Sequence, residues 1–305
     1  MHRRTFLATV PAAAMAAPML AARSGAARAA DAAGDSQYSG GPSAWEPGEE
    51  HFIRNDVHAG NRVIGASFAS RTAVYGRSGA AGTAHPLATL TGIEILKRGG
   101  SAIDACIAMN ACLGFLEPTS SGLGGDCYVM LWDPSQGKVV GLAGSGASPR
   151  KLTLEIARAH AKDGALPPVG PASVSTPGVC DAWWTLHQRY GRLKWADLFE
   201  PAIHMAEEGT PFPDIIAYYI RLAMASYRKR KAEVGEIDNA IHTYGEGPAA
   251  GAVFRNPDLA RTYRMIAHGG RDAFYKGPIA KTIDAYFKRI GGWLSHEDLR
   301  EQHAE

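Results

Sequence analysis

Disulfide and metal-binding patterns are lacking from this sequence. Four cysteines in 305 residues, with no Cys-x-x-Cys pair, are too few for a disulfide scaffold. Cys106 and Cys112 lie six residues apart on one predicted helix and face different sides, so they cannot bridge. Cys127 lies in an apolar run and Cys180 beside a Pro-Gly turn, and we expect all four to be buried, unreactive thiols. His-Glu-x-x-His is absent too, so the sequence predicts neither a metal nor any other cofactor.

An excess of charge of one sign is also lacking. The chain has 32 Lys and Arg against 30 Asp and Glu, a formal net charge of +2, which gives no overall field to attract nucleic acid or an anionic membrane. The basic run 228–231 lacks stacking aromatics and is expected to be the solvated end of a helix, where cations suit the dipole. With 46% hydrophobic residues the composition is that of an ordinary globular protein. A small-molecule function therefore remains open.

The N-terminus lacks a hydrophobic run long enough to anchor the protein in a membrane. Arg3 and Arg4 precede an uncharged, Ala-rich stretch that two prolines interrupt, and Ala27-Arg28-Ala29 then offers a small-x-small cleavage site. We therefore expect residues 1–29 to be a twin-arginine signal peptide, with no stable membrane anchor and a periplasmic or secreted destination. Residues 30–65 are predicted to be a flexible arm, and residues 66–305 the folded part.

Two adjacent helices and a hairpin are predicted in the first half of the folded part. Pro86 suits the first turn of a helix that Gly99-Gly100 ends, and Ser101 with Asp104 forms a weak capping box for the next helix. Residues 102–115 are apolar around nearly the whole circumference, which predicts a buried helix lying against a sheet. The hairpin runs from Cys127 to Trp132 and from 138 to 142, with turn chemistry at residues 133–137 between the two strands. Further helices are expected at 152–162, 195–208, 215–233, 259–268 and 279–290.

Two glycine-rich segments are candidates for a binding site. Residues 120–125 lie between a helix and a strand, the wrong order for a phosphate loop, and lack its Lys-Ser/Thr pair. Ser145, between Gly144 and Gly146, lacks the outer glycines and the strand-to-helix elbow of a hydrolase nucleophile. We interpret Gly144, Ser145 and Gly146 as the wall of a polar pocket.

A series of short motifs in a fixed order resembles a known family. The stretches are Ala84 to Thr89 with Gly92 to Leu96, Gly99 to Ala105, Glu117-Pro118 with Ser121 to Gly125, Thr176-Pro177-Gly178, Tyr190-Gly191, Pro201 to Ile203 with Ala206 to Gly209, Phe274 to Gly277 with Ile279-Ala280, and Gly291-Gly292 with Glu297-Asp298-Leu299. Together they resemble the gamma-glutamyltranspeptidases, a family of N-terminal-nucleophile hydrolases. The likeness extends from about Gly82 to the last residues.

The resemblance implies an α+β fold, an αββα sandwich, which would be incomplete in this chain and mainly helical after residue 150. It also implies a proenzyme that cleaves itself and exposes a threonine, whose hydroxyl attacks an amide carbonyl while its own amino group acts as base. In the family that threonine opens the small subunit. We therefore expect the nucleophile beyond Glu305, no catalytic residue in this chain, a small-subunit partner from the same precursor, and no activity from these residues alone.

The substrate expectation rests on one departure from the family pattern. Members that act on glutathione hold the substrate α-carboxylate with an arginine, and in motif register that position is Ser145. Losing such a contact would weaken the substrate about tenfold to a hundredfold. Arg150 is a candidate substitute five residues on. The sequence leaves three readings open: a glutathione hydrolase-like enzyme, an amidohydrolase for another small-molecule amide such as oxamate or an acyl-lactam, or a non-catalytic fragment or binding module.

Overall fold

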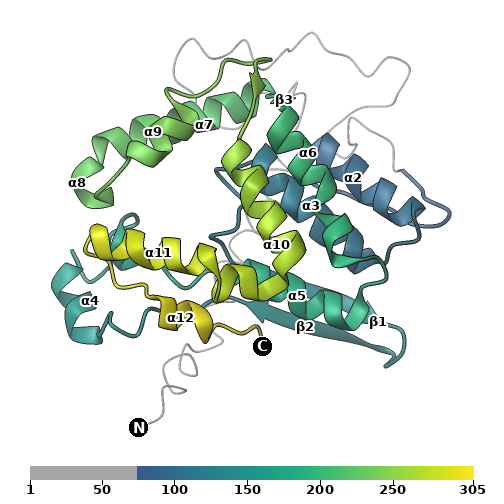
Figure 1. Ribbon diagram of the computed structural model, residues 1–305, viewed down its shortest axis with the longest axis horizontal. Helices are drawn as coiled ribbons and strands as arrows, with labels where there is room; N and C mark the ends of the chain where they lie inside the picture. The colour runs from purple at the N-terminus through teal and green to yellow at the C-terminus, as the bar shows by residue number, and fades with distance from the viewer. Residues whose placement is uncertain (1–73) are drawn as a thin grey trace, which may run out of the picture. The chain divides into compact units, whose positions relative to one another are not determined.

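The computed structural model describes residues 74–305, and Figure 1 shows their helices and strands. The predicted signal peptide, residues 1–29, the predicted arm, residues 30–65, and the first residues of the predicted folded part lie outside the described residues. Residues 76–305 cluster as one unit by their internal contacts. The predicted boundary near Ala66 stays a prediction.

The first two helices begin at the caps that the sequence predicts. Helix α2 (Pro86–Lys97) has His85 as its N-cap, and Nδ1 of His85 accepts a hydrogen bond of 3.2 Å from the amide of Leu87. Helix α3 (Ala102–Leu116) begins with a complete capping box, in which the Asp104 amide donates to Ser101 Oγ and the Ser101 amide donates to Asp104. These local bonds satisfy amide groups that the first turn of a helix leaves free.

Helix α3 is buried along most of its length, but its main neighbours are helices. It packs against α2, α5 (Val179–Tyr190) and α6 (Glu200–Glu208), whereas α5 is the helix that packs on both strands of the hairpin (Figure 1). The expectation that α3 lies against the sheet was therefore wrong about its main contacts. Cys106, expected to be buried, is exposed, because it lies on the one side of α3 that no other described element covers well.

The hairpin consists of β1 (Cys127–Asp133) and β2 (Lys138–Gly144), paired antiparallel from Cys127 opposite Gly144 to Asp133 opposite Lys138. Asp133 fixes the turn, since it accepts hydrogen bonds from the amide of Ser135 (3.0 Å) and Nε2 of Gln136 (2.6 Å). Alternate side chains point to opposite faces of a strand. Those of one face pack on the core, and those of the other are exposed: Tyr128, Met130, Trp132 and Val139.

The remaining elements are mainly helices, as predicted after residue 150. They are α4 (Leu154–His160), η3 (Pro171–Ser173), η4 (Trp195–Leu198), β3 (Thr210–Pro211), α7 (Asp214–Lys229), α8 (Lys231–Val234), α9 (Asp238–Tyr244), β4 (Val253–Phe254), α10 (Pro257–Tyr275), α11 (Pro278–Arg289) and α12 (His296–Arg300). Two predicted helices are split, at Phe199 and at Arg230. Helix α10 is longer than predicted and bends at Gly270, whose φ of 61° favours glycine.

The core joins α3, the region of β3 and β4, and α10 through aromatic side chains. Phe115 of α3 packs against Phe212 and Phe254, with ring centroids 5.6 and 5.9 Å away. The hydroxyl of Tyr263 on α10 is buried and donates a 2.8 Å hydrogen bond to the Ala111 carbonyl of α3. The core thus joins segments far apart in sequence, which hold the hairpin-bearing side of the unit in place.

Candidate functional site

The open end of the hairpin brings Asp126 to Ser145. Because Cys127 pairs with Gly144, the next residue on each side extends the same register, and Asp126 lies opposite Ser145. Ser145 Oγ donates a 3.0 Å hydrogen bond to Oδ2 of Asp126, and the Gly146 amide donates a 3.4 Å bond to Oδ1. We refer to Asp126 with Gly144, Ser145 and Gly146 as the Ser145 corner. Asp126 is exposed, and Ser145 is half-buried.

The two glycines of the corner are required by close backbone packing. The segment Thr176 to Gly178 runs alongside them, and the Thr176 amide donates to the Ala147 carbonyl at 3.0 Å. A Cβ on Gly146 would lie 1.6 Å from the Thr176 carbonyl oxygen, and one on Gly144 would lie 2.5 Å from Cβ of Ala182 on α5. Only glycine lets these segments meet, and the interpretation of both glycines as the wall of a polar pocket stays a prediction.

The glycine-rich loop at residues 120–125 is fixed to the same place. The Gly125 carbonyl accepts bonds of 3.0 Å from the amides of Gly178 and Val179 at the start of α5. Asn110 of α3 donates to Ser121 Oγ at 3.2 Å and accepts from the indole of Trp183 at 2.9 Å. The loop, the start of α5 and the corner are thereby one connected backbone arrangement, and the loop forms a tight junction between α3 and β1.

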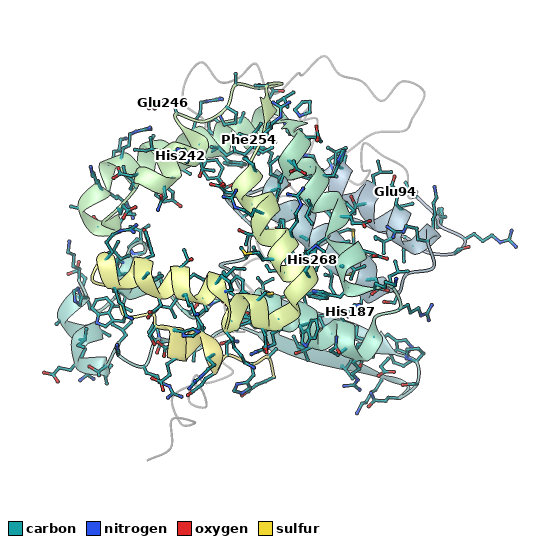
Figure 2. The ribbon with its side chains drawn as sticks, viewed as in Figure 1. Glu94, His187, His242, Glu246, Phe254 and His268 are labelled. Atoms are coloured by element: carbon teal, nitrogen blue, oxygen red, sulfur yellow. The ribbon has the colours of Figure 1, made fainter. Side chains whose placement is uncertain are left out.

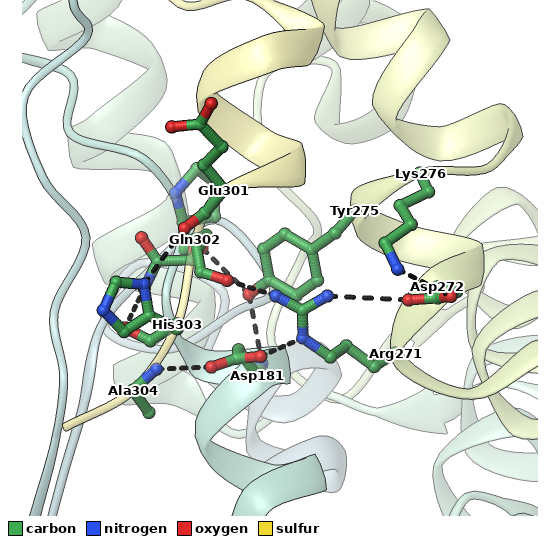
Figure 3. A network of polar contacts seen from close by, with 10 residues as sticks. Asp181, Arg271, Asp272, Tyr275, Lys276, Glu301, Gln302, His303 and Ala304 are labelled. Carbon is green, nitrogen blue, oxygen red and sulfur yellow. Dashed lines mark hydrogen bonds and ion pairs between the residues drawn. The ribbon is translucent and has the colours of Figure 1, made fainter.

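The last residues of the chain lie against β2 beside the corner. The amides and carbonyls of Glu305 and Ala143 exchange hydrogen bonds of 2.7 and 2.9 Å. Figure 3 shows the polar network behind this contact: Arg271 of α10 binds the Asp181 carboxylate and the Gln302 carbonyl, and the Ala304 amide donates to Asp181. Asp181 is buried at the start of α5. The network holds residues 302–305 at the edge of the hairpin.

Arg150, the candidate substitute for a substrate-binding arginine, is engaged elsewhere. Its guanidinium forms an ion pair with Glu301, and its backbone amide donates to Asp298 Oδ1 at 2.9 Å. Both partners belong to α12 or its C-cap. The structure thus gives Arg150 a partner outside the Ser145 corner.

The described part of the chain offers little support for a metal site or a cysteine nucleophile. No group of three or more His, Cys, Asp or Glu residues there is arranged to hold a metal ion, and His187, His242 and His268 come from three different helices (Figure 2). Burial raises the pKa of the Cys112 thiol to about 12 and raises the pKa of Cys180, which makes both poor nucleophiles. The four cysteines are free thiols. Residues 74–305 contain no helix with the length and apolarity that crossing a membrane requires.

The sequence profile described as gamma-glutamyltranspeptidase matches residues 88–305. The chain belongs to the gamma-glutamyltranspeptidase family. The match starts at α2 and covers the hairpin, the Ser145 corner and the helices that follow. The resemblance expected from the short motifs is therefore confirmed over most of the chain.

Individual relatives show the same family likeness. The oxamate amidohydrolase proenzyme of Klebsiella pneumoniae is 32% identical over 226 residues, which cover 72% of this chain and 41% of that protein. Two solved structures each align with a TM-score of 0.67. One is a gamma-glutamyltranspeptidase from Pseudomonas nitroreducens, 30% identical, covering 76% of this chain and 67% of that one. The other is a cephalosporin acylase from Bacillus halodurans, 40% identical, covering 72% of this chain and 41% of that one.

These alignments establish the fold class. The described residues form the helices and short sheets of an incomplete α+β unit of the N-terminal-nucleophile hydrolase type, as the sequence predicts. The chain spans about two fifths of the length of the curated relatives it matches.

Asp126 is the polar residue of the corner that the sequence analysis missed. Ser145 was selected because it lies between two glycines and in register with the family arginine. Neither criterion applies to Asp126, its neighbour on the paired strand. The signal was only partly available in the predicted hairpin, which places Asp126 at the same end as Gly144 and Ser145. A turn at residues 133–137 would pair Asp126 with Gly144, whereas the observed pairing of Asp133 with Lys138 shifts the register by one residue and places Asp126 opposite Ser145.

Proposed function

We propose that this chain is the large-subunit part of an enzyme that hydrolyses or transfers the acyl group of a small-molecule amide. The observation that carries the proposal is the family match over residues 88–305. An N-terminal threonine supplied beyond Glu305 would attack the amide carbonyl, and water or an acceptor amine would resolve the acyl-enzyme. In this proposal the chain holds no catalytic residue, and its residues form one side of the acyl pocket.

The Ser145 corner is the proposed substrate-binding part of this chain. Gly144 and Gly146 let the segment Thr176 to Gly178 and helix α5 approach the corner closely, and Ser145 takes the position at which the family resemblance expects a carboxylate-binding arginine. We infer that the acyl group is other than γ-glutamyl. The relatives from Klebsiella pneumoniae and Bacillus halodurans are named an oxamate amidohydrolase and a cephalosporin acylase, whereas other relatives of about 30% identity are named glutathione hydrolases. The choice over a glutathione hydrolase-like activity therefore rests on Ser145.

The small subunit of the same precursor is the proposed partner. The outer face of the hairpin exposes Tyr128 (70% exposed), Met130 (82%) and Trp132 (61%) next to one another on alternate positions. An apolar face of this kind is usually covered in a native protein. This observation favours a two-subunit enzyme over an independent, non-catalytic binding module.

The test is to follow the complete precursor encoded at this locus. We expect its reading frame to continue past Glu305 to a threonine, and the purified protein to give two polypeptides on a denaturing gel. Substitution of that threonine by alanine should leave a single polypeptide without amidase activity. A single uncleaved polypeptide from the unaltered gene would contradict the proposal, and so would amide hydrolysis by purified residues 1–305 alone.

Hydrogen exchange on the isolated chain tests the alternative of a binding module. Our proposal predicts rapid exchange of the hairpin amides at residues 127–142 in the isolated chain and slow exchange in the complete enzyme, because the hairpin face is then covered. Uniform protection in the isolated chain would favour an independent module.

The proposed location is the periplasm or the exterior of the cell, from the twin-arginine pattern at Arg3-Arg4. Replacing both arginines with lysine should retain the precursor in the cytoplasm, as cell fractionation would show. Unchanged export of that variant would overturn the location.

A further inference from the structure

The Ser145 corner contains a carboxylate where the family resemblance expects a cation. Asp126 accepts from Ser145 Oγ at 3.0 Å and from the Gly146 amide at 3.4 Å, so its side chain lies beside Ser145, the residue in register with the expected arginine. Neither Asp126 nor Ser145 forms part of the packed core, and both are accessible. The carboxylate is therefore available to an acyl group that enters the corner.

The charge of Asp126 has no ionic partner among residues 74–305. Two arginines that contact the C-terminal segment form ion pairs with other carboxylates: Arg150 pairs with Glu301, and Arg271 pairs with Asp181. Ion pairs of the described residues include none to Asp126. The corner thus carries net negative charge.

The hydrogen bonds within the corner, like its negative charge, favour a ligand that donates hydrogen bonds. The Ser145 hydroxyl proton and the Gly146 amide proton are both directed to Asp126. A hydroxyl oxygen keeps lone pairs after donating its proton, and a carboxylate accepts several bonds. The remaining capacity of the corner is therefore to accept hydrogen bonds from a ligand.

We propose that Asp126 determines the specificity of this site: it disfavours acyl groups that carry a carboxylate and selects acyl groups that present a hydrogen-bond donor, best an ammonium. This inference rests on the proposed amidase function and narrows its substrate class. The physical basis is that the Asp126 carboxylate repels a substrate carboxylate and attracts a substrate ammonium. Because the Ser145 hydroxyl donates its proton to Asp126, its oxygen can only accept a hydrogen bond from the substrate. Asp126 therefore also acts as a positioning residue for Ser145.

The experiment uses the complete, self-cleaved enzyme and four p-nitroanilides of matched chain length. The γ-glutamyl compound carries an ammonium and a carboxylate, the 4-aminobutyryl compound only the ammonium, the glutaryl compound only the carboxylate, and the butyryl compound neither. We expect kcat/KM for 4-aminobutyryl anilide to exceed that for glutaryl anilide at least about tenfold, the order of effect of one nearby charge.

Asp126→Asn is the decisive variant, because asparagine keeps a similar size and an acceptor oxygen for Ser145. It should reduce the preference for 4-aminobutyryl over glutaryl about tenfold, with butyryl turnover changed by less than about threefold. Ser145→Arg should raise glutaryl turnover, since it adds a cation at the corner. Glu94→Gln on α2, an exposed carboxylate on another element, is the matched control and should leave the preference unchanged.

The outcomes separate this inference from the proposed function. A wild-type precursor that never cleaves itself and hydrolyses no amide overturns the proposed function. A self-cleaved enzyme overturns the specificity assignment alone if it leaves the 4-aminobutyryl anilide intact, prefers the glutaryl compound, or shows the same preference in Asp126→Asn. An equal fall in all four activities of that variant would show that Asp126 only holds the end of the hairpin.

Discussion

Helix α3 and the β1–β2 hairpin are both strongly apolar in sequence, but the rest of the chain covers them differently. Helix α3 is enclosed by α2, α5 and α6, and Phe115 near its end is 1% exposed. The hairpin is covered on one face by α5, and on its other face Met130 is 82% exposed. The described residues thus complete the packing of one element and leave half of the other open.

The difference explains where the site lies. The Ser145 corner is at the end of the half-covered element, at the junction of the open hairpin face with the packed helices. The helical side fixes the corner through Asn110, Gly125 and the start of α5. The remaining walls of an acyl pocket would have to come from the proposed small subunit. A rigid support on one side and an open face on the other suit a site shared by two polypeptides.

The largest expected effect comes from removing a large side chain on the enclosed side. Phe115→Ala should lower the free energy of unfolding by about 3–5 kcal/mol, because the cavity would lie between the rings of Phe212 and Phe254. Met130→Ala on the open hairpin face should change it by less than about 0.5 kcal/mol. Urea unfolding of the full chain measures both. Equal losses would show that the hairpin face is covered within this chain.

A smaller loss is expected where the two regions meet. Gly146→Ala places a methyl group against the Thr176 carbonyl, and overpacking of this kind costs about 1–3 kcal/mol. Gly141→Ala in the middle of β2 is the matched control, since its nearest neighbour would be the Val129 carbonyl oxygen at 3.8 Å. Thermal unfolding should separate the two variants by several degrees. Similar melting temperatures would remove the structural requirement for glycine at position 146.

The elements that the sequence predicted correctly are those set by local chemistry. The capping box at Ser101 and Asp104 and the turn chemistry at Asp133 depend on residues within a few positions of each other. Two neighbours of α3, the helices α5 and α6, come from segments more than sixty residues further along the chain, and periodicity only indicated that α3 is buried. The exposure of Cys106 was missed for the same reason, since it depends on which side of α3 is covered.

The candidate site was partly predictable. Ser145 and its glycines were selected from composition and family register, but the reason for the glycines lies in the approach of Thr176, thirty residues further on. The predicted hairpin placed Asp126 at the correct end of the strands, but its position opposite Ser145 depends on a register that differs by one residue from that of the predicted turn. The engagement of Arg150 with Glu301 requires the arrangement of α12, which no local pattern in the sequence indicates.

Removing a single hydroxyl group compares the enclosed core around α3 with the open hairpin face on a smaller energy scale. Tyr263→Phe removes the donor to the buried Ala111 carbonyl and should lower the free energy of unfolding by about 1 kcal/mol. Tyr128→Phe removes a hydroxyl from the open hairpin face, where Tyr128 is 70% exposed, and should have almost no effect. Chemical denaturation of both variants with matched buffers is sufficient. A larger loss for Tyr128→Phe would reverse the assignment of covered and open regions.

The last expected effect is a pH dependence of stability that arises on the enclosed side. His85 caps α2, and its Nε2 is buried without a hydrogen-bond partner among the described residues. Burial lowers the pKa of His85 from its ordinary value near 6.5, against an opposing contribution from Glu117.

Between the lowered pKa and 6.5 the unfolded state binds more protons than the folded state, so His85 makes stability fall as the pH falls below about 6.5. One proton limits the slope to about 1.4 kcal/mol per pH unit. His85→Asn keeps a side-chain acceptor for the helix cap but cannot titrate, so the difference in stability from the wild type should shrink as the pH is lowered. A difference that stays constant with pH would mean that His85 is solvated in the native state, and the region around the start of α2 would then belong with the open side of the molecule.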